Sequence, residues 1–310
     1  MIIKEDVYKK AFEAKKNALR EKQTLRETAA AAAYNAEPRL TEIDRSLSSI
    51  GASLAIAALS GADVTNLKKQ SEALSREKKV LLDKFGVQDI KYDCPLCSDT
   101  GYVNGRICGC VKHLVAAFIA EEMSEEMPLG LSRFDNFDLK YYPDKDTKDG
   151  NPRRRMTKIF KTCYEYAFEF DPKTSGNLLF MGDAGLGKTH LTLAMVGKII
   201  EKGFVPVYGS AENLFSQIEK EKFTDGNRGA YDAMIKSDLL VIDDLGAEMA
   251  TPFSKSALYN LVNTRLLANR PTVINTNLTM KEIEARYTPR ISSRLIGSFA
   301  SHKFIGADIR

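Results

Sequence analysis

The sequence predicts an α/β fold with a parallel sheet, preceded by an all-helical segment and a small cysteine knuckle. Three observations carry this prediction. A glycine-rich stretch, residues 182–189, follows a short apolar run and precedes an apolar helix face. A second apolar run, residues 239–242, ends in two carboxylates, as a buried parallel strand does when it delivers polar groups to its carboxyl edge. Residues 4–85 instead carry long runs rich in Ala, Lys, Glu and Leu, which favour helices.

The glycine-rich stretch has the spacing of a phosphate-binding loop, in which two glycines bracket four residues and Lys-Thr follows. Glycines let the backbone curl so that its N–H groups point at phosphate oxygens. Lys188 would reach the β- and γ-phosphates of ATP, and the Thr189 hydroxyl would ligate Mg²⁺. The helix that follows offers the positive end of its dipole. The expected nucleotide-binding residues are contiguous: Gly182, Asp183, Ala184, Gly185, Leu186, Gly187, Lys188, Thr189 and His190.

Two later strands would bring polar side chains to the same edge of the sheet. Residues 236–244 end in Asp243 and Asp244, and residues 271–277 end in an amide, Asn277. Asp243 is placed to hold Mg²⁺ or its water. Asp244 is placed to orient or deprotonate the water that attacks the γ-phosphate.

Arginines follow the second of these strands at four-residue spacing. Arg286, Arg290 and Arg294 would share one face of a helix. Such a row is usually a solvated stripe. Beside a nucleotide site in an oligomer, one of them could instead reach the γ-phosphate of a neighbouring subunit.

Four cysteines lie in a stretch rich in turn-forming residues. Cys94 and Cys97 are followed after ten residues by Cys108 and Cys110, a set that suits tetrahedral Zn²⁺ in a structural role. His113 could replace one of these ligands. The fifth cysteine, Cys163, is expected in the core.

The helical segment before the knuckle has breaks near Pro38 and Gly61 and predicts three helices. It is either a structural spacer or a docking domain for a protein partner. We therefore expect a docking domain at 1–88, a zinc knuckle and linker at 89–129, and an ATPase domain at 130–310.

Composition sets broader limits. A net charge of +4 permits contact with nucleic acid without requiring it. No run of 18 apolar residues and no apolar signal-peptide core is present, which predicts a cytoplasmic protein without a membrane partner.

With these motifs in order, residues 130–310 resemble AAA+ ATPases. More narrowly, they are similar to DnaC/DnaI-type replicative helicase loaders and to IstB transposition helpers. The resemblance rests on residues 239–246 (LLVIDDLG), on residues 276–278 (TNL), and on residues 290–294 (RISSR). It implies an AAA+ core that lacks most of the C-terminal lid.

The resemblance also implies roles for single residues. Asn277 would be the sensor of the γ-phosphate and Arg294 the finger that acts in trans, supported by Arg290. Arg265 would also face the neighbouring subunit. With Lys188 and Asp244, Asn277 and Arg294 complete the expected catalytic set.

The resemblance to loaders also implies residues that contact DNA, and the acidic pair bears on the rate of ATP hydrolysis. Phe223 and Phe253 occupy positions comparable to the aromatic residues of loaders, and they either stack on bases of single-stranded DNA or belong to the core. The acidic pair is Asp-Asp where many AAA+ proteins have Asp-Glu, so hydrolysis would be slow.

Four functions remain open from the sequence. The first is a loader that assembles on single-stranded DNA through its ATPase domain and delivers a hexameric replicative helicase. The second is an IstB-like helper that binds DNA and a transposase. The third is a small-molecule kinase, against which Asn277 and Arg294 argue. The fourth is a zinc-centred adaptor with a silent ATPase.

Overall fold

The computed structural model describes residues 4–60, 63–124, 131–223 and 229–309. The chain divides into two compact units. The first comprises Met1–Ala11 together with Gly109–Arg310, and the second comprises Phe12–Cys108. Each unit is described separately below.

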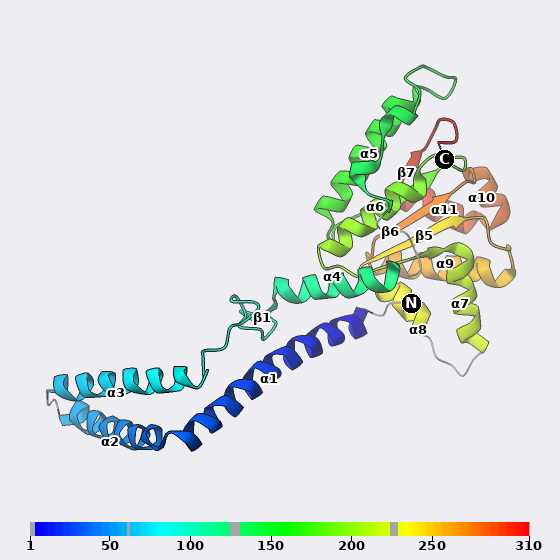
Figure 1. Ribbon diagram of the computed structural model, residues 1–310. Helices are drawn as coiled ribbons and strands as arrows, with labels where there is room; N and C mark the ends of the chain where they lie inside the picture. Colours follow the sequence, from blue (N-terminus) through cyan, green and yellow to red (C-terminus); the bar gives the residue numbers. More distant parts are fainter. Residues whose placement is uncertain (1–3, 61–62, 125–130, 224–228, 310) are drawn as a thin grey trace. The chain divides into compact units, whose positions relative to one another are not determined.

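The first unit is built on a parallel sheet of five strands in the order β4-β5-β6-β3-β7 (Figure 1). The strand of this sheet that comes first in the chain, β3, lies inside the sheet, between β6 and β7. The strands are β3 (Asn177–Met181), β4 (Pro206–Ser210), β5 (Leu239–Leu245), β6 (Thr272–Thr276) and β7 (Phe299–Lys303).

Helices cover both faces of this sheet. On one face α6 packs against β4 and β6, and α4 and α5 pack on α6. On the other face α7 to α11 enclose a core into which β-strand residues such as Leu179, Ile242 and Ile274 project. The helices are α4 (Gly109–Ser124), α5 (Pro152–Glu169), α6 (Lys188–Glu201), α7 (Ala211–Phe223), α8 (Gly229–Lys236), α9 (Pro252–Leu267), α10 (Met280–Arg286) and α11 (Pro289–Ser298).

Successive side chains of a strand point to opposite faces of the sheet, and this decides which of them lie near the phosphate-binding loop. Ile274 faces the core under α9, so its neighbour Asn275 points to the opposite face, where Thr192 of α6 donates a hydrogen bond to its Oδ1 at 3.1 Å. The polar residues near the nucleotide site therefore lie on the α6 face of the sheet.

One predicted helix is divided in two. Arg286 ends α10, and Arg290 and Arg294 belong to α11. The break follows from Thr288, which caps α11 by accepting a hydrogen bond from Ile291 N–H, and from Pro289 at the first helical position. The expectation of three arginines on one helix face is therefore wrong for Arg286.

The second unit contains most of a long helix, a helical hairpin and the cysteine knuckle. In the hairpin, Arg39 near the start of α2 pairs with Glu77 near the end of α3 at 2.8 Å, so the two helices are antiparallel. The knuckle holds a short antiparallel hairpin of β1 and β2. The elements are α1 (Lys4–Ala36), which begins in the first unit, α2 (Pro38–Ser60), α3 (Thr65–Lys84), β1 (Tyr102–Val103) and β2 (Arg106–Ile107).

These observations confirm the predicted fold class: an α/β core with a parallel sheet, N-terminal helices and a four-cysteine cluster. Within the described ranges, none of the helices combines the length and apolar character that crossing a bilayer requires.

Candidate nucleotide-binding site and metal centre

The loop between β3 and α6 needs its glycines. Gly182, Gly185 and Gly187 have φ angles of +147°, +74° and +83°, a region that side chains with a Cβ rarely adopt. Space is restricted as well, since a Cβ on Gly182 would lie 2.6 Å from the Phe304 carbonyl oxygen. A Cβ on Gly187 would lie 2.7 Å from the Tyr142 hydroxyl. The loop is thus held in a curled form that suits phosphate binding.

Lys188 lies at the base of this loop and is nearly buried, with 5% of its surface exposed. Its ammonium donates hydrogen bonds to the carbonyl oxygens of Gly182 and Asp183, at 2.6 and 2.7 Å. It also donates to Asn277 Oδ1 at 2.6 Å. The structure therefore brings Asn277, 89 residues away in the chain, into direct contact with Lys188.

The Asp243 carboxylate is oriented through both of its oxygens. Asn275 Nδ2 donates to Oδ1 at 2.7 Å, and the Tyr208 hydroxyl donates to Oδ2. Thr189 Oγ1 lies 3.4 Å from Oδ1. Burial, followed by the charge of Asp243, raises the pKa of Tyr208, so its hydroxyl remains a proton donor. Thr189 and Asp243 supply the hydroxyl and carboxylate oxygens that Mg²⁺ prefers.

Sequence reasoning did not identify Tyr208 and Asn275. The signal was present in the two-residue period of strands: Asn275 is two positions before Asn277, and Tyr208 is two positions before Ser210, which pairs with Asp243.

Tyr208→Phe is expected to lower the affinity for Mg²⁺ during nucleotide binding. Without the tyrosine hydroxyl, Asp243 Oδ2 loses its donor and the carboxylate is oriented through Oδ1 alone. The Mg²⁺ concentration for half-saturation should therefore rise by about tenfold. Titration of Mg²⁺ at fixed ATP, followed by a fluorescent nucleotide, measures this. Tyr231→Phe, on another half-buried tyrosine, is the control. An unchanged Mg²⁺ titration would contradict an orienting role for Tyr208.

Asp244 leaves the strand in an unusual conformation. Its φ is +50°, and the pairing of β5 with β6 changes register between Ile242 and Leu245. This bulge turns Asp244 into the open cavity while Asp243 stays buried. A left-handed backbone favours Asp and Asn among residues with a Cβ, which gives a local reason for Asp rather than Glu at this position.

These residues enclose a cavity of about 500 Å³. Its lining combines the loop with the ends of β5 and β6 and with the segment after β7, from which Ile309 N–H donates to the Gly185 carbonyl at 3.1 Å. The lining residues are Ala184, Gly185, Leu186, Gly187, Lys188, Thr189, His190, Asp244, Asn277 and Ile309.

Arg294 is held at the surface of α11 by α9. Its Nε donates to Asn263 Oδ1 at 2.9 Å, and Nη2 donates to the Tyr259 hydroxyl at 2.9 Å. The guanidinium also lies 4.5 Å from the centre of the Tyr259 ring. Arg294 is not among the residues described as lining the cavity of its own chain.

Arg265 does not face a neighbouring subunit, and that expectation is wrong. The side chain is completely buried. Its guanidinium donates to the carbonyl oxygens of Met234 and Pro271, at 2.5 and 2.6 Å, and to Thr272 Oγ1 at 3.0 Å. Arg265 therefore satisfies loop carbonyls beneath the sheet.

The two aromatic residues expected to contact DNA differ in what the structure describes. Phe253 is half-buried against the core, with the Lys222 ammonium 5.4 Å from its ring centre. The side chain of Phe223 lies outside the described residues.

The four cysteines of the knuckle form one cluster. All four Sγ atoms lie within 4.8 Å of one another, and Cys94 and Cys108 are 3.7 Å apart. A tetrahedron with Zn–S bonds of about 2.3 Å has edges of about 3.8 Å, so the donor set and its size fit Zn²⁺. Hydrogen bonds, first from the Cys97 backbone, lower the pKa of Cys94 to about 7, which favours the thiolate. The cluster comprises the cysteines and does not include His113.

Asp99 connects the knuckle to α1 within the second unit. It accepts hydrogen bonds from the backbone N–H groups of Asp93 and Cys94, and its Oδ1 pairs with the buried ammonium of Lys15 at 2.7 Å. Burial alone would raise the pKa of Asp99, but Lys15 and the two N–H groups lower it to about 2. Phe12 of α1 also stacks on Tyr102, with ring centres 4.9 Å apart.

Purified protein should carry about one Zn²⁺ per chain, bound by four thiolates. Cys97→Ser should lose the metal and increase hydrogen exchange across residues 92–113, because the knuckle has little apolar core of its own. Metal analysis by mass spectrometry measures the first effect and exchange the second. Cys163→Ser, on the buried cysteine of α5, should retain zinc. If metal analysis finds no zinc in protein that was purified anaerobically, the assignment is contradicted.

Comparison with known proteins agrees with this site. Residues 157–299 match the family described as IstB-like ATP binding protein. The phage-like element PBSX protein XkdC of Bacillus subtilis is 25% identical over 228 residues, covering 68% of this chain and 82% of that protein. The replicative helicase loader DnaC of Escherichia coli is 27% identical over 136 residues, covering 42% of this chain and 54% of DnaC.

An insertion-sequence putative ATP-binding protein of Geobacillus stearothermophilus is 26% identical over 148 residues, covering 48% of this chain and 53% of that protein. Among solved structures, the DnaC helicase loader matches with a TM-score of 0.47 at 20% identity, covering 56% of this chain and 98% of that chain. Residues 157–299 are therefore similar to IstB-like ATP-binding proteins, and the chain is more distantly similar to the DnaC helicase loader.

Proposed function

We propose that this protein is an ATP-dependent loader of a hexameric replicative helicase onto single-stranded DNA. The observation that carries the proposal is the position of Arg294. It is oriented by Asn263 and Tyr259 at the surface of α11, and it lies outside the described lining of its own nucleotide cavity. A cation held in this way can complete the site of a second copy, so ATP would act as an assembly switch.

Within one subunit the residues divide the chemistry of hydrolysis. Lys188 exchanges its bonds to loop carbonyls for the β- and γ-phosphates, and Asn277, already in contact with Lys188, reads the γ-phosphate. Thr189 and Asp243 would hold Mg²⁺, and this ion would neutralise charge on the phosphates. Asp244 orients the attacking water. Its shorter side chain makes hydrolysis slow, and DNA or the partner stimulates it.

The N-terminal region supplies the contact with the helicase. We assign residues 1–88 to partner docking, residues 89–129 to the zinc knuckle and linker, and residues 130–310 to the ATPase. Large apolar side chains are unusually exposed on the helices: Ile56 and Leu59 of α2 are 69% and 91% exposed, and Leu25 of α1 is 71% exposed. Exposed apolar side chains on helices are typical anchors for a partner's groove.

Capture from purified components tests this role. The full chain with ATP should retain a hexameric replicative helicase, and the double variant Ile56→Asp with Leu59→Asp should lose it while binding ATP normally. Ser48→Asp and Ser49→Asp, exposed on the same helix, are the matched controls. Helicase retention by the apolar-to-Asp variant would place docking elsewhere.

A transposition helper is the second candidate, favoured by the family match and by the insertion-sequence relative. It predicts retention of a transposase in the same experiment and a preference for duplex DNA. Retention of the transposase and not of the helicase would replace the loader proposal.

A further inference from the structure

The start of α5 carries an arrangement of charge that local helix physics disfavours. Arg153, Arg154 and Arg155 occupy its first turn, which has no acidic residue, and Lys158 and Lys161 follow. Cations at the N-terminal end of a helix oppose its dipole. Residues that break a local rule in this way often serve a function, and here the function has to involve an anion.

Three of these cations are available to such an anion. Arg153 is used internally, donating to the Tyr142 carbonyl at 3.0 Å, and Lys161 lies 3.6 Å from Glu165. Arg154, Arg155 and Lys158 are exposed, and within the described part of the chain they form no ion pair. They form an unneutralised basic strip along the outer face of α5.

Aromatic rings continue this strip along the same helix. With 3.6 residues per turn, Phe160, Tyr164 and Phe168 follow a line next to the one that carries Arg154 and Lys158. The Tyr164 and Phe168 rings are stacked with centres 4.1 Å apart, yet 41% and 42% of these residues remain exposed. Stacked rings beside unpaired cations are the combination that binds single-stranded nucleic acid.

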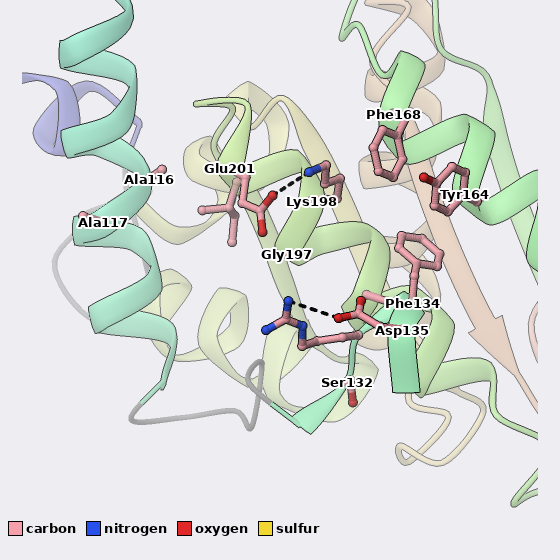
Figure 2. Close-up of a pocket in the computed structure, with 13 residues that line it drawn as sticks. Ala116, Ala117, Ser132, Phe134, Asp135, Tyr164, Phe168, Gly197, Lys198 and Glu201 are labelled. Atoms are coloured by element: carbon pink, nitrogen blue, oxygen red, sulfur yellow. Dashed lines mark hydrogen bonds and ion pairs between the residues drawn. The ribbon is translucent and has the colours of Figure 1, made fainter. Parts of the chain in front are cut away.

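The rings also form one wall of a groove of about 620 Å³ (Figure 2). Figure 2 shows Phe134, Tyr164 and Phe168 on one side and Ala116 and Ala117 of α4 on the other. Gly197 of α6 lies between them, and a Cβ there would meet no atom within 4 Å, so it leaves the groove open. A space of this size accommodates a planar base.

The charged residues of the groove are already paired with one another. Lys198 contacts Glu201 at 2.7 Å, and Arg133 contacts Asp135 at 3.2 Å. The Lys198 ammonium also lies 4.7 Å from the centre of the Phe168 ring. The groove is therefore close to neutral and aromatic, whereas the strip at the start of α5 is cationic. Such a division suits a ligand with an anionic backbone and uncharged rings.

We propose that α5 and this groove form a binding site for single-stranded DNA. Arg154, Arg155 and Lys158 contact its phosphates, and Tyr164 and Phe168 stack on unpaired bases at the mouth of the groove. The choice of DNA as the polymer rests on the proposed function. The site itself rests on the charges and rings of α5.

Binding of a fluorescent oligothymidylate to the full chain, followed by anisotropy at several salt concentrations, tests the phosphate contacts. For single strands each phosphate contact contributes about 0.7 to the slope of log affinity against log salt. Arg154→Ala, Arg155→Ala and Lys158→Ala together should therefore reduce the slope by about 2 and weaken binding about 10²-fold at about 0.1 M salt. A charge-matched triple variant on the helical hairpin, Arg45→Ala, Lys68→Ala and Lys69→Ala, should leave both values unchanged.

The rings are tested by conservative variants that keep apolar volume. Tyr164→Leu and Phe168→Leu should each weaken oligothymidylate binding by about tenfold without changing the salt slope, since stacking releases no counterion. Their affinity for duplex DNA of the same length should equal that of the wild type. Wild-type affinity and slope in the triple variant would overturn the proposal. A second result would also overturn it: the triple variant loses the same affinity for duplex as for single-stranded DNA, and the leucine variants lose none. That result would describe a surface that binds any nucleic acid through charge alone.

Two further readouts separate this proposal from the proposed function. Variants of α5 should still bind ATP and should still capture the helicase, because their sites lie elsewhere in the chain. If helicase capture fails in the wild type while oligothymidylate binding follows the pattern above, the loader role is wrong and the DNA site remains. If capture succeeds and the α5 variants bind DNA normally, the loader role remains and the site is wrong.

Discussion

Lys188→Ala is expected to abolish ATP binding, whereas Asp244→Asn should bind ATP normally and fail to hydrolyse it. Lys188 is the side-chain cation in contact with the phosphate loop, and its ammonium is 2.6 Å from both the Gly182 carbonyl and Asn277 Oδ1. Charge-assisted bonds to two phosphates would be lost with it, which corresponds to a loss of affinity on the order of 10²-fold or more. Calorimetric titration with ATP measures the difference.

The two variants control for each other. Asp244 has φ of +50°, a conformation that Asn tolerates as well as Asp, so Asp244→Asn removes the charge without straining the bulge. Lys188→Ala leaves two loop carbonyls without their donor, so its thermal unfolding has to be compared with that of the wild type. If the Lys188→Ala protein is folded and binds ATP as tightly as the wild type, the assignment of residues 182–189 as a phosphate-binding loop is wrong.

The parts of the fold that sequence predicted best are those where a local chemical requirement sets the residues. The loop of residues 182–189 needs glycines at positive φ, and its sequence spacing supplies them. The run of apolar residues before Asp243 predicts a buried strand because parallel strands are covered on both faces. Each of these signals lies within about ten residues of chain.

Prediction from the sequence failed where a residue's environment depends on contacts with residues far away in the chain. Arg265 carries a charge and sits on a helix, which predicts exposure, but loop carbonyls from Met234 and Pro271 converge on it and make burial favourable. Strand β7 has only one fully buried residue, Phe299, and becomes a strand because β3 offers it a free edge. Helix α4 lies within residues 89–129, for which the sequence predicts only a knuckle and a linker, and it forms where α6 provides a surface to pack on.

Arg294→Ala is expected to leave ATP affinity of the chain near normal and to reduce turnover by about 10³-fold or more, the value of an arginine that stabilises the transition state from a neighbouring subunit. The cavity of the variant keeps its described lining, since Arg294 is not part of it. Assembly on single-stranded DNA in the presence of ATP should weaken as well. Steady-state turnover with DNA and sedimentation with a non-hydrolysable ATP analogue measure the two effects. Ser293→Ala, exposed on the same helix, should behave as the wild type.

Mixing distinguishes a role in trans from a role in holding α11 to α9. Arg294 donates hydrogen bonds to Asn263 and Tyr259, so its removal also loosens contacts within the chain, and low activity alone proves nothing about a neighbour. Arg294→Ala supplies an intact pocket, and Lys188→Ala supplies an intact arginine. Together they should recover part of the turnover that each lacks alone. If both variants are folded and associate, yet their mixture stays as inactive as either one, then Arg294 acts only within its own chain, as a bond between α11 and α9.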